Sequence, residues 1–94
     1  SYAWGWHRRG LCLNRLGRYR EAITCFEDAL DWQIEHSDTA LELVKAACEC
    51  GEYEKALRGA ALFSEYKGEP QDIASWLVRI EEIAPQVNGE ESVA

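Results

Sequence analysis

The sequence predicts an all-α protein, and three observations support this class. Apolar residues recur three and four positions apart through most of the 94 residues, which is the spacing of one face of an α-helix. The stretch 17–23 returns in similar form at 51–57, which is 34 residues later. No segment shows the alternation of apolar and polar residues that marks a half-buried strand. The chain is therefore expected to consist of repeated helix pairs.

Gly17 separates the first two predicted helices. Trp6, Gly10 and Leu13 mark one face of the first helix, and Gly17 is a natural C-terminal stop. The second helix is expected over about 19–34. Its inward-facing residues are expected to be Ala22, Ile23, Phe26, Ala29 and Leu30.

A second pair of helices follows, and Gly51 divides it. Ser37 or Asp38 can cap the third helix, because short polar side chains accept hydrogen bonds from free N–H groups of the first turn. The fourth helix is expected over about 53–66. The apolar positions of the third helix are Ala40, Leu41, Val44, Ala47 and Cys48, and those expected inside on the fourth are Ala56, Leu57, Ala60 and Phe63.

A fifth helix is predicted after a break at 68–70. Pro70 suits the first turn of a helix, where its missing N–H is not needed. The apolar residues of this helix are Ile73, Trp76, Leu77, Ile80 and Ile83. Pro85 is expected to end it. Residues 85–94 have too little apolar content to pack and are expected to form a flexible tail.

The composition and net charge of the chain argue against two classes of binding partner, membranes and nucleic acids. Hydrophobic residues make up 47% and charged residues 29%, as in an ordinary globular protein. No apolar run approaches the length of a membrane span and no signal-peptide pattern is present, so no membrane partner is expected. The net charge of −7 argues against nucleic acid as a partner. Because the first residue is not Met, the chain is expected to be a processed or excised piece.

Charge is divided unequally along the chain. Residues 1–20 contain five arginines and no acidic residue, whereas all 17 Asp and Glu residues follow, against five Lys and Arg. Such a division can steer partners but does not establish a fold.

The four cysteines, at 12, 25, 48 and 50, are expected to be free thiols. All fall within helical patterns, where Cys often serves as a small buried apolar residue. The Cys48–Cys50 spacing is not that of a zinc site and neither His is near it in sequence, so no metal and no cofactor are predicted. Cys12 and Cys25 lie on neighbouring helices and are the pair that could come close. Reduced thiols favour a cytoplasmic, intracellular location.

Catalysis has no support in the motifs. His7 and His36 are isolated, no Ser or Cys has a base at a recognisable spacing, and no glycine-rich phosphate loop is present. The carboxylate pairs at 81–82 and 90–91 are interpreted as solvated charge. The chain is therefore not expected to be an enzyme.

The 34-residue recurrence resembles the tetratricopeptide repeat, a unit of two helices. The first copy matches the signature of that family at Trp6, Gly10, Leu13, Leu16, Gly17, Tyr19, Ala22, Phe26 and Ala29. The resemblance implies an α-solenoid of antiparallel helix pairs. It divides a domain of residues 1–84 into a first repeat at about 3–36, a second at about 37–69 and a C-terminal capping helix at about 70–84.

The second copy departs from the family pattern. Val44 replaces the small residue that matches Gly10, and Ala60 and Phe63 invert the order of Phe26 and Ala29. The inversion roughly keeps the total volume, so the packing can adjust. Two repeats are fewer than such arrays usually need for stability, and this leaves both missing upstream repeats and self-association open.

The resemblance implies a non-enzymatic protein–protein interaction module. Arrays of this family hold a peptide or helix of a partner in a concave groove, lined by the first helix of each repeat. The corresponding positions are Trp4, His7, Leu11, Asn14 and Arg15 in the first repeat and Asp38, Leu41, Lys45, Cys48 and Glu49 in the second; the capping helix would add Gln71, Ala74 and Val78. Each of these can also be an ordinary solvated or half-buried position.

The charges of the expected groove favour an acidic ligand. Arg8 and Arg15 lie two turns apart on roughly one face of the first helix. An acidic segment with one or two apolar anchors would place carboxylates toward Arg15 and apolar side chains toward Trp4 and Leu11.

One family subtype does not fit. Its chaperone-binding members clamp a terminal carboxylate with a Lys and an Asn of the first repeat. Here His7 and Leu11 occupy those places, and Glu42 stands where the second repeat's Asn is expected.

The alternative function is structural self-assembly. The basic first helix and the acidic end of the chain could meet head to tail, either between copies or within a longer repeat array. Head-to-tail contact gives filaments unless it closes into a ring.

Overall fold

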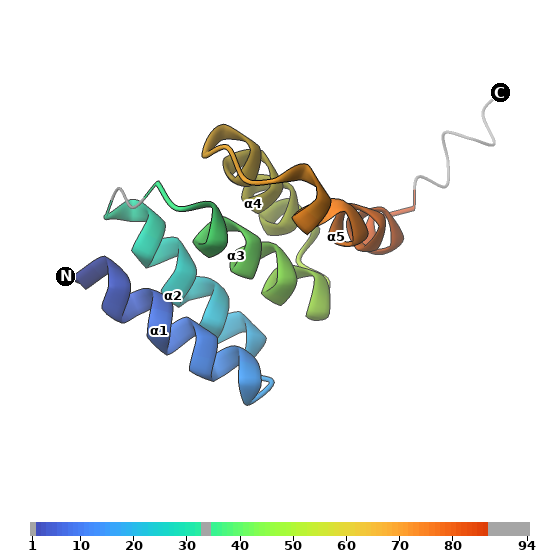
Figure 1. Ribbon diagram of the computed structural model, residues 1–94. Helices are drawn as coiled ribbons and strands as arrows, with labels where there is room; N and C mark the ends of the chain where they lie inside the picture. Colours follow the sequence, from blue (N-terminus) through green and yellow to red (C-terminus); the bar gives the residue numbers. More distant parts are fainter. Residues whose placement is uncertain (1, 33–34, 87–94) are drawn as a thin grey trace, which may run out of the picture.

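A computed structural model describes residues 2–32 and 35–86, which form five α-helices (Figure 1). The helices are α1 (Tyr2–Arg15), α2 (Tyr19–Asp31), α3 (Ser37–Glu49), α4 (Tyr53–Glu65) and α5 (Pro70–Ile83). No strand occurs in these two segments. The predicted all-α class is confirmed, with helix pairs arranged as in an α-solenoid.

The helices pack in the order of the chain. Each of α1 to α4 contacts the helix that follows it, and α1 and α5 each also contact α3. Alternate helices therefore form two layers, with α1, α3 and α5 in one layer and α2 and α4 in the other (Figure 1). The first layer is the one in which the expected groove lies.

Glycine forms the turn within each helix pair. Gly17 and Gly51 have φ angles of 75° and 74°, a region that glycine adopts without the steric cost that a Cβ adds. At the first turn the N–H of Arg18 donates to the carbonyl of Leu13 over 2.9 Å, a hydrogen bond that closes the end of the helix. Both predicted helix stops are confirmed.

The same turn recurs after α4 without glycine at its left-handed position. Lys67 has a φ of 63°, and the N–H of Gly68 donates to the carbonyl of Phe63 over 2.9 Å. Gly68 is needed for another reason, because a Cβ there would collide with the Phe63 ring.

Two helix ends differ from the sequence predictions. The N-cap of α3 is His36, and no side chain caps the helix, so the predicted capping by Ser37 or Asp38 is wrong. Ser37 is already helical, which leaves its hydroxyl inside the first turn rather than ahead of it. Helix α2 ends at Asp31 with Trp32 as its C-cap, so the predicted end at about 34 is too late. Of the predicted flexible tail at 85–94, residues 87–94 lie outside the described residues.

Phe26 is the centre of the first helix pair. Its side chain is fully buried, as are Ala22 and Ala29, which confirms the expected inner face of α2. A Cβ on Gly10 would lie 2.5 Å from the Phe26 ring, so glycine in α1 lets the ring rest on the helix backbone. Truncating a buried Phe to Ala typically costs about 3–5 kcal/mol.

The second helix pair reaches the same close packing with the sizes exchanged. Val44 of α3 is fully buried and packs on Gly59 of α4, where a Cβ would lie 2.8 Å from Cγ2 of Val44. Phe63 is also buried, one turn further along α4. The bulky residue on the first helix is therefore matched by a glycine on the second, the reverse of Gly10 and Phe26.

The expectation that Leu57 faces inward is wrong. Leu57 is 41% exposed, whereas Ala56, Gly59 and Phe63 form the buried face of α4. Successive helical residues are about 100° apart around the axis, so Leu57 lies to one side of that face. Leu77 of α5, 44% exposed, lines the same cleft as Leu57.

Candidate protein-interaction surface

The N-terminal half of α1 is joined to α3 through His7. The ring of His7 is buried, and its Nδ1 is joined to Oγ1 of Thr39 by a hydrogen bond of 2.9 Å. Burial lowers the pKa of His7, opposed by the carboxylates of Glu42 and Asp38, while nearby His36 lowers it further. His7 thus has a structural role in joining α1 to α3, in addition to the partner-binding role predicted from the sequence.

Trp4 lies over the same junction and presents an apolar surface. Its ring centroid is 4.9 Å from that of His36 and 5.6 Å from that of His7, both edge-on. The side chain is 43% exposed, so these contacts fix one part of the indole and leave another part accessible. Aromatic residues held in this way are suited to anchoring a partner's apolar side chain.

The C-terminal half of α1 offers an apolar, an amide and a cationic side chain in turn. Leu11 and Asn14 are half-buried, and Arg15 is exposed. The Oδ1 atom of Asn14 is buried and has no hydrogen-bond partner among residues 2–32 and 35–86. An unsatisfied buried acceptor typically costs about 1–3 kcal/mol.

The predicted residues of α3 divide into buried and accessible ones. Leu41 and Cys48 are buried, and burial raises the pKa of the Cys48 thiol. Lys45 is half-buried, with Nζ 3.3 Å from Oε2 of Glu42. Exposed Glu49 lies 3.6 Å from Nη2 of Arg79, an ion pair that joins α3 to α5.

The remaining predicted positions lie on exposed parts of α3 and α5. Asp38 is exposed in the first turn of α3, and Gln71, Ala74 and Val78 are exposed on α5. The accessible part of the predicted set therefore runs from Trp4 through Arg15 to α5. Its role in binding stays a prediction.

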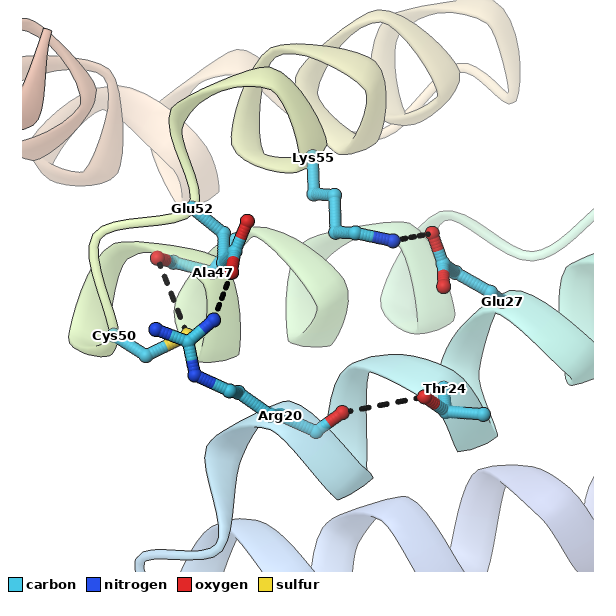
Figure 2. Close-up of polar contacts among 7 residues, drawn as sticks. All are labelled: Arg20, Thr24, Glu27, Ala47, Cys50, Glu52 and Lys55. Carbon is cyan, nitrogen blue, oxygen red and sulfur yellow. Dashed lines mark hydrogen bonds and ion pairs between the residues drawn. The ribbon is translucent and has the colours of Figure 1, made fainter. Parts of the chain in front are cut away.

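The opposite layer is tied together by its own charges. Nζ of Lys55 in α4 lies 2.8 Å from Oε2 of Glu27 in α2, and Arg20 pairs with Glu52 (Figure 2). These side chains are partly exposed, so each pair contributes at most about 1 kcal/mol to folding. Their charges are engaged within the chain and are less available to a partner.

The sequence analysis missed a cleft between α4 and α5. It has a volume of about 550 Å³ and is lined by Tyr53, Leu57, Ala60, Leu77, Ile80, Glu81 and Ala84. A second hollow of about 280 Å³ shares Ala60 and Leu77 and extends the cleft toward Pro70. The signal in the sequence was the apolar character of Leu77 and of Leu57, which was expected to face inward.

Neither a metal site nor a membrane-spanning helix is found in the part of the chain that the structure describes. Its His, Cys, Asp and Glu side chains form no group of three that could hold a metal ion. None of its helices combines the length and apolarity needed to cross a membrane.

Comparison with known proteins gave one finding. Residues 3–31, which comprise α1 and α2, match the family model of the tetratricopeptide repeat. No curated protein and no solved structure matched the chain.

Proposed function

Since the chain carries a tetratricopeptide repeat and is assigned to that family, we propose that it is a non-enzymatic module that binds a peptide or helix of another protein across α1, α3 and α5. Repeats of this family typically mediate protein–protein interaction. A cytoplasmic location is part of the proposal and is supported by the four free thiols.

The observation that carries the proposal is the accessible row on α1. Trp4 presents part of an indole fixed between two histidines, and Arg15 presents a guanidinium three turns along the same helix. Leu11 and Asn14, both half-buried, lie between them. Buried aromatic and Arg anchors are the side chains that most often dominate binding energy at interfaces.

The ligand proposed for this row is an acidic segment with one or two apolar anchors. Its carboxylates would pair with Arg15, and its apolar side chains would contact Trp4 and Leu11. Asp38 is an exposed acid on α3 and would repel a ligand that is acidic throughout, whereas Glu49 is paired with Arg79. This asymmetry supports a fixed direction of binding.

Binding of acidic peptides with one aromatic or leucine anchor, measured by fluorescence polarisation, tests the proposal. We expect Arg15→Glu to weaken the best binder about tenfold or more, because it replaces attraction by repulsion. Arg58→Glu, an equal charge change in the opposite layer, is the matched control and should leave affinity unchanged. Equal affinities for wild type and Arg15→Glu, or no binding of any such peptide, would contradict the proposal.

A second candidate function is self-association. The observation that favours it is the division of charge, with five arginines and no acid in residues 1–20 and all 17 acids beyond them. Sedimentation velocity at two protein concentrations, each in low and high salt, tests it. The mass should rise with concentration and fall with salt, because salt screens the attraction between exposed charges.

A further inference from the structure

We propose that the cleft between α4 and α5 is the docking site for α1 of a second copy of the chain. The inference rests on the self-association proposed above and names the two surfaces that meet. It follows from the chemistry of the cleft, from an exposed stripe on α1, and from the opposite charges of Arg9 on the stripe and Glu81 in the cleft.

The cleft has the length and the lining that suit a helix. With its extension it follows α4 from Tyr53 to Ser64 and α5 from Pro70 to Ala84. At 1.5 Å per residue the α5 side is about 21 Å long. Apart from Glu81, the lining residues are uncharged, and most of them are apolar.

Helix α1 carries an exposed stripe of matching length. The stripe consists of exposed residues three and four positions apart: Tyr2, Gly5, Arg9 and Cys12 of α1, and Leu16 in the turn that follows it. Tyr2 is 75% exposed and Leu16 is 68% exposed, which is high for apolar side chains of this size. A cleft of about 530 Å³ lies along the stripe and is lined by Tyr2, Gly5, Trp6 and Arg9.

The glycine of the stripe favours close approach of another helix. A Cβ on Gly5 would meet no atom of its own chain within 4 Å, so nothing within this chain explains a glycine there. Glycine in the middle of a helix costs about 0.5–1 kcal/mol relative to alanine. A helix packed against the stripe would make use of the missing side chain.

The charges of the two surfaces are complementary. Helix α1 contains Arg8, Arg9 and Arg15 and no acidic residue. The single charged residue of the stripe is Arg9, and Glu81 is the single charged residue among those that line the cleft. Arg9 lies halfway along its stripe and Glu81 one turn from the middle of α5, a distance that an arginine side chain can span.

The two surfaces cannot meet within one copy. Helices α1 and α5 lie at opposite ends of the row of helices and make no contact with each other (Figure 1). Contact between them therefore joins the head of one copy to the tail of the next. Such contact is heterologous and produces open chains, or a ring where the rotation between copies closes.

Sedimentation velocity of the whole chain over a range of concentrations tests the inference. Arg9→Glu and Glu81→Arg should each weaken self-association about tenfold, and the double variant should regain most of the loss because the pair is restored with its signs exchanged. Leu77→Arg should weaken it as well, by placing a charge in the apolar cleft. Arg8→Glu changes the same charge on the same helix away from the stripe, and should have a smaller effect than Arg9→Glu.

The outcomes separate the inference from the proposal on which it rests. A wild-type chain that stays monomeric at every concentration would overturn both. If the wild-type chain associates and the variants Arg9→Glu, Glu81→Arg and Leu77→Arg associate equally well, the docking site alone would be overturned. Failure of the double variant to recover, when each single variant is impaired, would overturn the pairing of Arg9 with Glu81. Thermal melting of each variant shows whether its monomer is folded.

Discussion

Gly5 and Gly10 occupy the same helix but opposite environments, and their substitution should have opposite effects. A Cβ on Gly10 would collide with the Phe26 ring, whereas a Cβ on Gly5 would meet no atom within 4 Å. We expect Gly10→Ala to destabilise the protein by about 1–3 kcal/mol through overpacking. Gly5→Ala should stabilise it by up to about 1 kcal/mol. Urea unfolding measures both, and an equal change in the two variants would contradict the packing described for Phe26.

The buried ring of His7 should make stability depend on pH. Its pKa is lowered in the folded state, chiefly by burial, so the unfolded chain binds more protons as the pH falls below about 6.5. The free energy of unfolding should therefore be unaffected by this group above that pH, and it should decline as the pH falls toward the folded-state pKa of His7. The slope is at most about 1.4 kcal/mol per pH unit. Melting temperatures from pH 7.5 to 5.5 should fall less in His7→Gln than in wild type, and parallel curves would contradict the assignment.

The thiols should react at rates set by their exposure. Cys12 is exposed and Cys50 half-buried, whereas Cys25 and Cys48 are buried and burial raises the pKa of both. Because the thiolate is the reactive form, Cys12 should be modified first and the two buried thiols last. Titration of the unfolded, unreduced protein should find four reactive groups. Two or fewer would show that a disulfide exists.

At the scale of single residues, the resemblance to the repeat family predicted accessible positions on α1, but it did not predict which polar side chain of that helix is buried. Trp4 and Arg15 were expected on the surface and lie there. The burial of His7 depends on Thr39, which is 32 residues away and contacts it only once α3 packs beside α1. Nothing in the local pattern around His7 indicates that contact.

Substitutions in the turns that follow α1, α3 and α4 test the turn geometry directly. Gly17 and Gly51 have positive φ angles and open space around the position of a Cβ, so alanine there would be strained by backbone conformation alone. We expect each Gly→Ala change to cost about 1–2 kcal/mol. Lys67→Gly should instead stabilise the protein, because Lys67 adopts the same conformation with a side chain. Denaturant unfolding measures the stability of all three variants. Gly→Ala variants as stable as wild type, or a Lys67→Gly variant less stable than wild type, would contradict the turn geometry.

At the scale of elements, the boundaries that glycine and proline mark could be predicted, but the boundaries between α2 and α3 and the packing between elements could not. The sequence shows Val44 where the family pattern has a small residue, and it gives no reason to pair Val44 with Gly59. That pairing needs the distance between α3 and α4. Leu57 was misplaced for the same reason, since an apolar residue beside a buried face can equally line a cleft.

At the scale of the whole molecule, the arrangement in two layers gives the two sides different chemistry. The α2 and α4 layer is joined by the pairs Lys55–Glu27 and Arg20–Glu52 (Figure 2). In the other layer the exposed side chains of α1 carry positive charge with no acidic partner on that helix. The two ends of the row differ as well, with the stripe of α1 at one end and the α4–α5 cleft at the other.

The central claim is that a protein partner binds across α1, α3 and α5, and mapping the contact by NMR tests it most directly. Backbone amide shifts would be followed while an acidic peptide with an apolar anchor is added to the ¹⁵N-labelled chain. We predict that the changes gather at Trp4, Leu11, Asn14, Arg15 and Lys45, with little change in α2 and α4. Changes confined to α2 and α4, or to the residues that line the α4–α5 cleft, would contradict the claim.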